Sequence, residues 1–583
     1  MQITPIDEML APADLGVPLL RVLIPNEDNY SVLLLQPKGL IDADATGVHH
    51  VDSVSAAKQF CGFLDEAQRT KADLAVTPEY SMPWATLLGA LKAGHKPEKG
   101  ALWVLGCESI KYGDLAAIKL DIAPQATLLY EPLTADPKRF VDPLAYVFVA
   151  PAAMGTGPDN LVVLVQFKTC PMGDNGHFEI NGMQRGTHIY QFGGGANSLR
   201  LVTLICSDAL DFLDQQATAV YDRTLVLHIQ LNPKPRQEQF KQYRSRLMRF
   251  AGDLTEIICL NWAQDVFQGG GKHSKCWNNI SGSAWYLRPD KFDDGDQTLT
   301  VNHKRGLYYT WLLALRSHAL FFNYQPATYL LTATKVAHIG VSASLSRRRG
   351  PQLIETRSWD EAMSSWVVHA TPEDGFASIV AECGNAQSQI KSIADINPFN
   401  AERVLALCAG NIGPSQDWYA LRSLDSFGIE SSEVIRRITV CQDPDPDARA
   451  FRIARLKRCG RLWEILTAQA GLPAALADLT AGFHLEWNPN YAHQNVLSSA
   501  GKRSTVIYMG EDASASQIET VLKRVAEYLH RASGSPDNSI EARQRLHVWF
   551  RNDTDQIELF DAARYLKYDD PRSTSEFDIA RAE

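Results

Sequence analysis

Residues 199–206 read LRLVTLIC, a mostly apolar run that ends on a cysteine. A short run of this composition is typical of a strand buried in a sheet. Similar runs lie on both sides of it between about residues 19 and 340, and mixed apolar and charged patterns suited to amphipathic helices occur at 54–70 and 236–252. This alternation predicts a layered α/β fold. The other expected strands are 19–24, 30–36, 73–78, 101–107, 146–151, 161–167, 224–232 and 256–262.

Length and composition limit the class of protein. The chain has 583 residues, more than one ordinary domain, so two or more folding units are expected. With 45% hydrophobic and 21% charged residues, a disordered chain, a collagen and a disulfide scaffold are excluded. The 57 basic and 67 acidic residues leave a net charge of −10, so the chain as a whole does not indicate a nucleic acid or a membrane surface as its partner.

Cysteine usage and apolar segments bear on the cellular compartment. The ten cysteines contain no CxxC pair, which favours reduced thiols and excludes a zinc ribbon. The first ten residues, MQITPIDEML, are acidic where a signal peptide needs a basic region. The most apolar window, residues 306–322, is interrupted by Arg316. We therefore expect a cytoplasmic protein without a membrane span.

A charge run followed by Gly and Pro at 344–351, SLSRRRGP, predicts a domain boundary; an exposed loop inside one domain is the alternative. Beyond it, the chain looks mainly helical and then forms a small α/β unit, in which Ser516 and Glu519 suggest a capping box. The predicted regions are 1–345, with an N-terminal extension at 1–29, then 351–495 and 496–583.

Three reactive side chains each follow an expected strand. Glu79 follows DLAVTP, Lys168 follows LVVLVQF, and Cys206 ends LRLVTLIC. Side chains in such positions can converge at one mouth of a layered sheet structure. Each signal is weak alone, because a carboxylate after a strand is usually solvated and a lone cysteine is usually inert core.

The three residue types suit one chemistry. A free thiol has a pKa near 8.5 and needs an adjacent base or cation to become an effective nucleophile. Glu79 can serve as the base for Cys206. Lys168 and the backbone amide of Ser207 can stabilise negative charge that develops when the thiolate attacks a carbonyl or nitrile carbon.

These segments, together with ALWVLGCES, EIICLNWAQ and SGSAWYLRP, resemble the nitrilase superfamily of carbon–nitrogen hydrolases over about residues 30–300. The resemblance implies a four-layer α-β-β-α sandwich and a Glu79, Lys168, Cys206 triad. It also implies a second carboxylate after the lysine, for which Glu179 is the nearest candidate. The implied fold is therefore α/β, a nitrilase-like sandwich with a C-terminal, mostly helical plus small α/β region.

The residues around the triad show one departure from that family. Ser207 stands where an aromatic residue commonly follows the nucleophile, whereas Asp208 keeps the usual acidic neighbour. Three aromatic residues beside the motifs are candidates for lining a substrate pocket together with Ser207, although buried packing is the commoner role of such side chains. They are Tyr80, Trp84 and Trp262.

Cofactor motifs are not found. The loop QGGGKHS at 268–274 lacks the spacing of a phosphate-binding GxxxxGK[ST] motif, and we find no SGG-type ATP site of the kind carried by NAD-making relatives. The pair His49–His50 has no partner ligands at a recognisable spacing, so a solvated turn is the favoured interpretation. No metal and no cofactor are expected.

The leading hypothesis is a cysteine-dependent hydrolase of amide bonds that works through a thioester, with a small-molecule amide as substrate. The alternative is a nitrilase-like binding or assembly module in a multi-protein bacterial complex, such as an antiviral defence complex. In that case the C-terminal region would contact a protein partner. By resemblance, a homo-oligomer is expected under either hypothesis.

Overall fold

The structure is a computed structural model. It describes residues 1–562 except 25–28, 156, 174–177, 195–198, 221–222, 234–241, 245, 248–254, 264–265, 270–274, 278–282, 288–307, 313–316, 323–325, 335–350, 369–378, 397, 421–445, 470 and 512. Contacts divide the described chain into two units, one reaching through β21 (Ser365–Val368) and the other beginning just before η7 (Ala381–Ala386).

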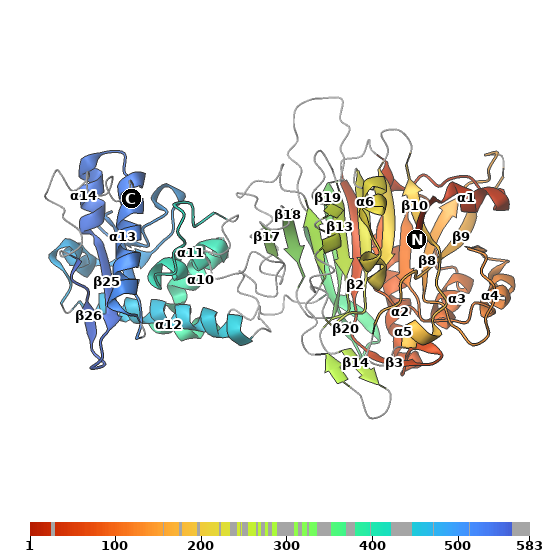
Figure 1. Cartoon of the computed structure of the whole chain (residues 1–583), viewed down its shortest axis with the longest axis horizontal. Coiled ribbons are helices and arrows are strands. Elements are labelled where there is room, and N and C mark those ends of the chain that lie inside the picture. Colours follow the sequence, from red (N-terminus) through yellow and green to blue (C-terminus); the bar gives the residue numbers. More distant parts are fainter. Residues whose placement is uncertain are drawn as a thin grey trace. The chain divides into compact units, whose positions relative to one another are not determined.

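The first unit contains a nine-stranded sheet in the order β21-β20-β19-β2-β5-β6-β8-β9-β7 among the described residues (Figure 1). Strands β5, β6 and β9 run in one direction, because β5 and β6 pair in parallel while β8 is antiparallel to both β6 and β9. The strands are β2 (Asn29–Gln36), β5 (Leu74–Val76), β6 (Leu102–Gly106), β7 (Thr127–Tyr130), β8 (Pro143–Ala150), β9 (Asn160–Phe167), β19 (Ala327–Thr334), β20 (Gln352–Asp360) and β21 (Ser365–Val368).

An eight-stranded sheet of the described chain, in the order β1-β10-β11-β12-β13-β16-β18-β17, faces the first one. Gln166 of β9 reaches across: its Nε2 donates to the carbonyl of Thr203 in β11, and its Oε1 accepts from the backbone N–H of Tyr190 in β10. The strands are β1 (Gln2–Pro5), β10 (His188–Gly193), β11 (Arg200–Ile205), β12 (Thr224–Ile229), β13 (Glu256–Leu260), β16 (Ala284–Leu287), β17 (Tyr308–Leu312) and β18 (Ser317–Phe321).

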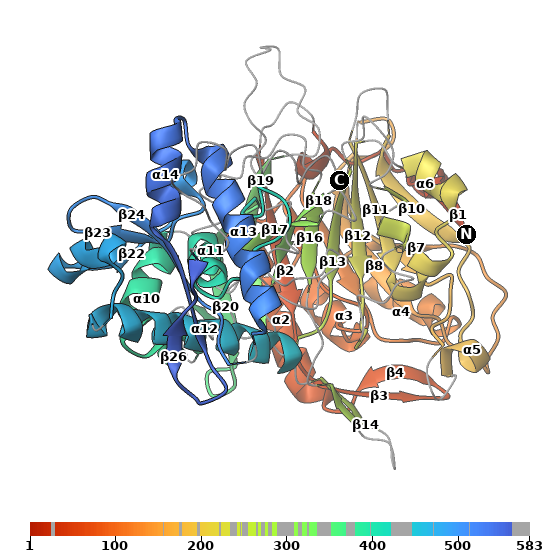
Figure 2. The same ribbon diagram turned by 60° about the vertical axis from the view of Figure 1, so that its left-hand side comes forward.

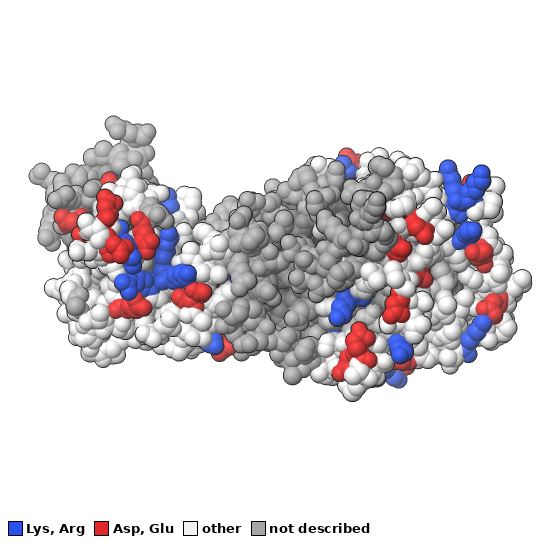
Figure 3. Space-filling view, turned by 90° about the horizontal axis from the view of Figure 1, so that it is seen from below, with Lys and Arg blue, Asp and Glu red and all other residues white. Residues whose placement is uncertain are grey.

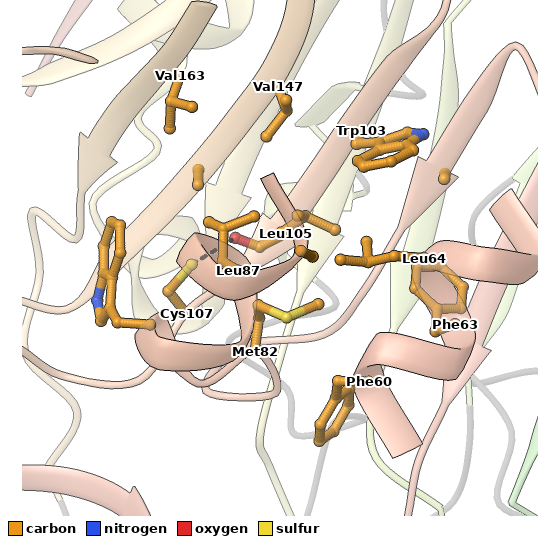
Figure 4. Packing of buried hydrophobic residues seen from close by; sticks show 14 of the residues in the cluster. Phe60, Phe63, Leu64, Met82, Leu87, Trp103, Leu105, Cys107, Val147 and Val163 are labelled. Carbon is orange, nitrogen blue, oxygen red and sulfur yellow. Dashed lines mark hydrogen bonds between the residues drawn. The ribbon is translucent and has the colours of Figure 1, made fainter. Parts of the chain in front are cut away.

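Strand periodicity explains how the nine-stranded sheet buries both faces. Successive side chains point to opposite sides, so Gln166 faces the second sheet while its neighbour Val165 faces outward. The outward residues form one hydrophobic cluster with α2 (Ser53–Thr70) and α3 (Trp84–Lys92), as Figure 4 shows for Phe60, Phe63 and Trp103. The helices therefore cover the outer face of this sheet, as expected for a layered α/β sandwich.

The remaining elements of the first unit are short. A four-stranded sheet of the described chain, ordered β15-β14-β3-β4, lies at one side of the sandwich (Figure 2). The elements are α1 (Asp7–Leu10), η1 (Ala11–Ala13), η2 (Arg21–Leu23), β3 (Leu40–Asp44), β4 (Gly47–His50), α4 (Asp114–Ile122), α5 (Phe178–Gly182), η3 (Cys206–Leu210), α6 (Asp214–Val220), β14 (Val266–Gly269) and β15 (Lys275–Trp277).

The second unit is built around a five-stranded sheet of the described chain, ordered β22-β23-β24-β25-β26. Its elements are η7, α10 (Gln387–Ile396), α11 (Pro398–Cys408), α12 (Pro446–Ala468), η9 (Ala474–Ala481), β22 (Phe483–Leu485), η10 (Pro489–Tyr491), β23 (Val496–Ser498), β24 (Arg503–Tyr508), α13 (Ala515–Ala532), α14 (Pro536–Gln544), β25 (Leu546–Arg551) and β26 (Ile557–Leu559). Leu456 and Leu462 of α12 share a hydrophobic cluster with Val506 of β24. The helical region and the sheet thus have a common core.

The division of the chain differs from the expected one in two places. Strands β20 and β21 continue the nine-stranded sheet, since β20 pairs with β19, so residues 352–368 belong to the first unit and not to a helical region. The expected boundary at 344–351 lies mostly outside the described residues. The shared core of the second unit also joins the two regions that the sequence separated at 495.

Three local expectations are corrected. Residues 21–23 form a single 3-10 turn instead of a strand, and His49–His50 lies in β4 instead of a solvated turn. The N-cap of α13 is Ser514, whose capping partner is Gln517, two residues before the pair that the sequence suggested. The apolar stripe of α13 is nevertheless buried as its spacing predicts: Ile518, Val521, Leu522, Val525 and Leu529.

On the face shown in Figure 3, the described acidic and basic side chains lie among one another. Among the described residues, the structure has no helix that is both long enough and apolar enough to cross a membrane.

Candidate active site

The ends of three strands bring the reactive side chains together. Glu79 and Lys168 follow β5 and β9, which run in the same direction, so both lie at one end of the nine-stranded sheet. Cys206 follows β11 of the facing sheet. All three are buried, with exposed fractions of 2% for Glu79, 0% for Lys168 and 1% for Cys206.

Lys168 is the centre of this cluster. Its Nζ donates to Glu79 Oε1 at 2.8 Å and to Glu179 Oε2 at 2.7 Å. Burial opposes the ammonium form, but the charges of Glu179 and Glu79 outweigh it and hold the pKa of Lys168 well above its ordinary value. The second carboxylate that the sequence suggested is therefore in contact with the lysine.

Cys206 interacts with the same groups. Burial, followed by the Glu79 charge, raises the pKa of the Cys206 thiol well above its usual value, against the effect of Lys168. Burial also raises the pKa of Glu79, against Lys168. At neutral pH the sulfur therefore keeps its proton, and Glu79 is the carboxylate placed to accept it.

The backbone at Cys206 is held in an unusual conformation. Its φ is 44°, in the left-handed region that a residue with a side chain seldom occupies. His228 Nε2 lies 2.8 Å from the Cys206 carbonyl oxygen, and burial lowers the pKa of His228 to about 3, so the neutral ring donates that hydrogen bond. Asp208 accepts from the backbone N–H of Ile205 and of Thr169. These contacts stabilise the strained turn that presents the sulfur.

Glu79 is held by main-chain contacts. Its Oε2 accepts from the backbone N–H of Leu231 at 2.9 Å, and its carbonyl accepts from the indole N–H of Trp262 at 2.8 Å. Gly106 of β6 packs directly behind it. A Cβ at Gly106 would lie 2.1 Å from the Pro78 carbonyl oxygen and 2.8 Å from the Glu79 Cα.

Gly106→Ala should therefore displace Glu79 and lower stability. Because the colliding atoms are backbone, we expect a cost of about 1–3 kcal/mol in the free energy of unfolding, as for other overpacked cores. Chemical denaturation measures this loss, and alkylation of Cys206 reports the displaced base. Gly89→Ala is the matched control, since nothing lies within 4 Å of its added Cβ. Equal stability of both variants would contradict the tight approach.

A second group of polar residues lies beside Lys168; the sequence named only Tyr80 among them and missed Asp142 and Ser109. The Tyr80 hydroxyl lies 2.8 Å from Asp142 Oδ2, 2.9 Å from Glu179 Oε1 and 3.4 Å from Lys168 Nζ. Ser109 Oγ donates to Asp142 Oδ1 at 2.5 Å. The only signal for Asp142 was an acidic residue directly before an apolar strand, which by itself is too common to indicate a site.

The candidate pocket residues occupy different places. Tyr80 joins the carboxylate cluster through its hydroxyl. Trp84 and Trp262 belong to the hydrophobic cluster under α2, with their indole N–H groups bonded to the carbonyls of Glu108 and Glu79. Ser207 is fully buried, and its Oγ donates to the Cys170 carbonyl. Both indoles are therefore part of the packed core, and Trp262 holds the backbone of Glu79 through its hydrogen bond.

A metal centre is not apparent in the part of the chain that the structure describes, where no group of three or more His, Cys, Asp or Glu side chains is arranged to hold an ion. The His50 ring instead lies with Nε2 2.9 Å from the Ser81 carbonyl oxygen and packs against Phe60 and Trp262.

Comparison with known proteins gives structural matches only. No protein-family model matches the chain, and a search of curated proteins gives no match either. A glutamine-dependent NAD+ synthetase from Acinetobacter baumannii matches at 13% identity over 68% of this chain, with a TM-score of 0.31; the match spans 58% of the synthetase.

Two other matching structures belong to the nitrilase or CN-hydrolase superfamily. A variant of an amidase of the nitrilase superfamily from Nesterenkonia matches at 12% identity over 42% of this chain and 80% of its own, with a TM-score of 0.25. A CN-hydrolase superfamily protein from Xanthomonas campestris matches at 12% identity over 53% and 91%, with a TM-score of 0.29. Because these identities and TM-scores are low, the proposed function rests on the contacts within this chain.

Proposed function

We propose that this protein hydrolyses carbon–nitrogen bonds of small amides through a thioester on Cys206. The observation that carries the proposal is the buried cluster in which Lys168 bridges Glu79 and Glu179, and in which the charges of Glu79 and Lys168 act on the buried Cys206 thiol. A buried lysine, a buried base and a strained cysteine in one cluster form an arrangement typical of a nucleophile activated by an adjacent base.

The first half-reaction begins with proton transfer. Glu79 takes the thiol proton as the sulfur forms a bond to the amide carbon, and the carbonyl oxygen becomes an oxyanion. The Lys168 ammonium and the Ser207 backbone N–H are the donors that we assign to that oxyanion. Collapse of the tetrahedral adduct breaks the carbon–nitrogen bond, and Glu79 returns its proton to the departing amine.

The second half-reaction reverses these roles with water. Glu79 accepts a proton from water as the oxygen attacks the thioester carbon, which again places charge on the carbonyl oxygen. The carbon–sulfur bond then breaks, and the sulfur regains a proton from Glu79. Products are a carboxylic acid and ammonia or an amine. Glu179 accepts a hydrogen bond from Lys168 and so keeps the ammonium in place.

A screen of small primary amides by ammonia release tests this activity, together with mass spectrometry for an acyl adduct on Cys206. Any labelling of Cys206 by a small thiol probe at neutral pH should depend on Glu79, because the raised pKa keeps the sulfur protonated until Glu79 accepts its proton. Uniform slow labelling of all cysteines, without ammonia release or adduct, would instead favour the binding or assembly module.

Glu79 and Glu179 are distinguished by matched amide substitutions. Glu79→Gln should slow acylation by about 10²- to 10⁴-fold, because it removes the proton acceptor of the thiol. Glu179→Gln should slow acylation less. Glu179 accepts a hydrogen bond from Lys168, and its charge acts on the Cys206 thiol less strongly than the charge of Glu79 does. Single-turnover acylation measured for both variants decides the assignment. A larger acylation defect in Glu179→Gln would reverse the two roles.

A further inference from the structure

The Tyr80 hydroxyl poses a proton-counting problem. It lies within hydrogen-bond distance of two carboxyl oxygens, Asp142 Oδ2 at 2.8 Å and Glu179 Oε1 at 2.9 Å. A phenol carries one hydrogen, so it can donate to only one of them. An ionised carboxylate only accepts, so the other short contact requires a proton on one of the two carboxyl groups.

The partners of the two carboxyl groups identify where that proton lies. Glu179 is paired with the Lys168 ammonium, and the same oxygen, Oε2, accepts from the backbone N–H of Met172 at 2.6 Å. Asp142 has neutral side-chain partners, Tyr80 and Ser109, and is only 1% exposed. A buried carboxyl group without its own cation is the one that stays protonated.

We propose that Asp142 is a positioning residue that carries a proton and donates it to the Tyr80 oxygen, so that Tyr80 donates to Glu179 and Glu179 remains the ionised partner of Lys168. The resulting chain runs from Asp142 through Tyr80 and Glu179 to Lys168. This role rests on the proposed hydrolase function and deepens it, because it explains what holds the Lys168 ammonium in position.

The charge of the cluster supports this assignment. The groups that face Asp142 are Tyr80 beyond β5, Ser109 beyond β6, Lys168 beyond β9 and Glu179 in α5. With all carboxyl groups ionised, one ammonium would face three buried negative charges from Glu79, Glu179 and Asp142. Burial, and after it the Glu179 charge, raises the pKa of Asp142 to about 7. A neutral Asp142 removes the charge that has no direct partner.

Two substitutions of Asp142 test whether its side chain donates a hydrogen bond to the Tyr80 oxygen or accepts one from it. In Asp142→Ala, Tyr80 loses its donor, and we expect the rate of Cys206 alkylation by iodoacetamide at pH 6 to fall by about tenfold as the ammonium and Glu79 shift. Asp142→Asn supplies an amide N–H to Tyr80 and a carbonyl to Ser109, so it should restore most of the wild-type rate. Peptide mass spectrometry quantifies the alkylation. An Asn variant as impaired as the Ala variant would overturn the proposal.

Thermal stability as a function of pH gives a readout that needs neither substrate nor a reactive thiol. Because the pKa of Asp142 is raised from 3.8 in the unfolded chain to about 7 in the fold, the folded state holds the extra proton between these values. Wild-type stability should therefore fall, relative to Asp142→Asn, as pH rises from 5 to 8. A difference in Tm between the two proteins that is constant over this range would show that Asp142 holds no proton.

Asp208→Asn is the matched control for a buried aspartate. All its hydrogen-bond partners donate to it: the backbone N–H groups of Ile205, Thr169 and Cys170 and the Thr169 hydroxyl. An amide there turns an acceptor into a donor that faces other donors, so this variant should lose stability where Asp142→Asn does not. If no amide substrate is found, the Tm comparison still decides the state of Asp142.

Discussion

Cys206→Ala is expected to abolish amide turnover and acyl-adduct formation while the protein stays folded. The substitution removes the buried thiol on which the Glu79 and Lys168 charges act, and without a nucleophile the remaining groups give no thioester. The loss of one buried sulfur atom should lower stability by only about 1 kcal/mol. Ammonia release, mass spectrometry and thermal unfolding measure the three effects.

Cys107→Ala is the matched control for this loss. Cys107 is as buried as Cys206, at 1% exposure, and its thiol contacts the Leu105 carbonyl instead of a carboxylate. Its removal should leave turnover and the labelling of Cys206 in place. Turnover that survives in Cys206→Ala would refute the hydrolase proposal.

Lys168→Met is expected to damage both the fold and the chemistry. The methionine fills similar volume but leaves Glu79 and Glu179 buried without their cation, and breaking a buried pair by removing one partner costs about 3–5 kcal/mol. Loss of an oxyanion donor should separately lower the rate by about 10²- to 10³-fold. Denaturation and single-turnover acylation distinguish the two losses.

A double variant tests whether the stability loss of Lys168→Met comes from the carboxylates that it leaves without a cation. Adding Glu179→Gln to Lys168→Met removes one of the stranded charges, so the double variant should regain part of the stability but none of the rate. Lys99→Met provides the surface control, because Lys99 pairs with Asp159 while its side chain is 71% exposed, and it should change stability by about 0.5 kcal/mol or less. Stability of Lys168→Met equal to that control would contradict a charged Lys168.

The local pattern of apolar residues predicted most of the strands expected in the first unit. Eight of the nine expected strands overlap an observed strand, because buried strands need short apolar runs whatever lies beside them. The strand predicted at residues 19–24 is wrong. Apolar residues also suit a 3-10 turn that packs against the core, as Val22 and Leu23 do. The boundary in front of β20 failed because β20 pairs with a strand already in the sheet, which no local signal reports.

The sequence by itself determined that Glu79, Lys168 and Cys206 each follow a buried strand, because strand ends can be located from apolar runs. Only the tertiary structure decided that Glu179 contacts the lysine, that Tyr80 joins it to Asp142, and that His228 supports the cysteine turn. The physical reason is that these contacts depend on which strands lie beside each other and on hydrogen-bond geometry across two sheets. Neither property is encoded in the residues next to any one of these side chains.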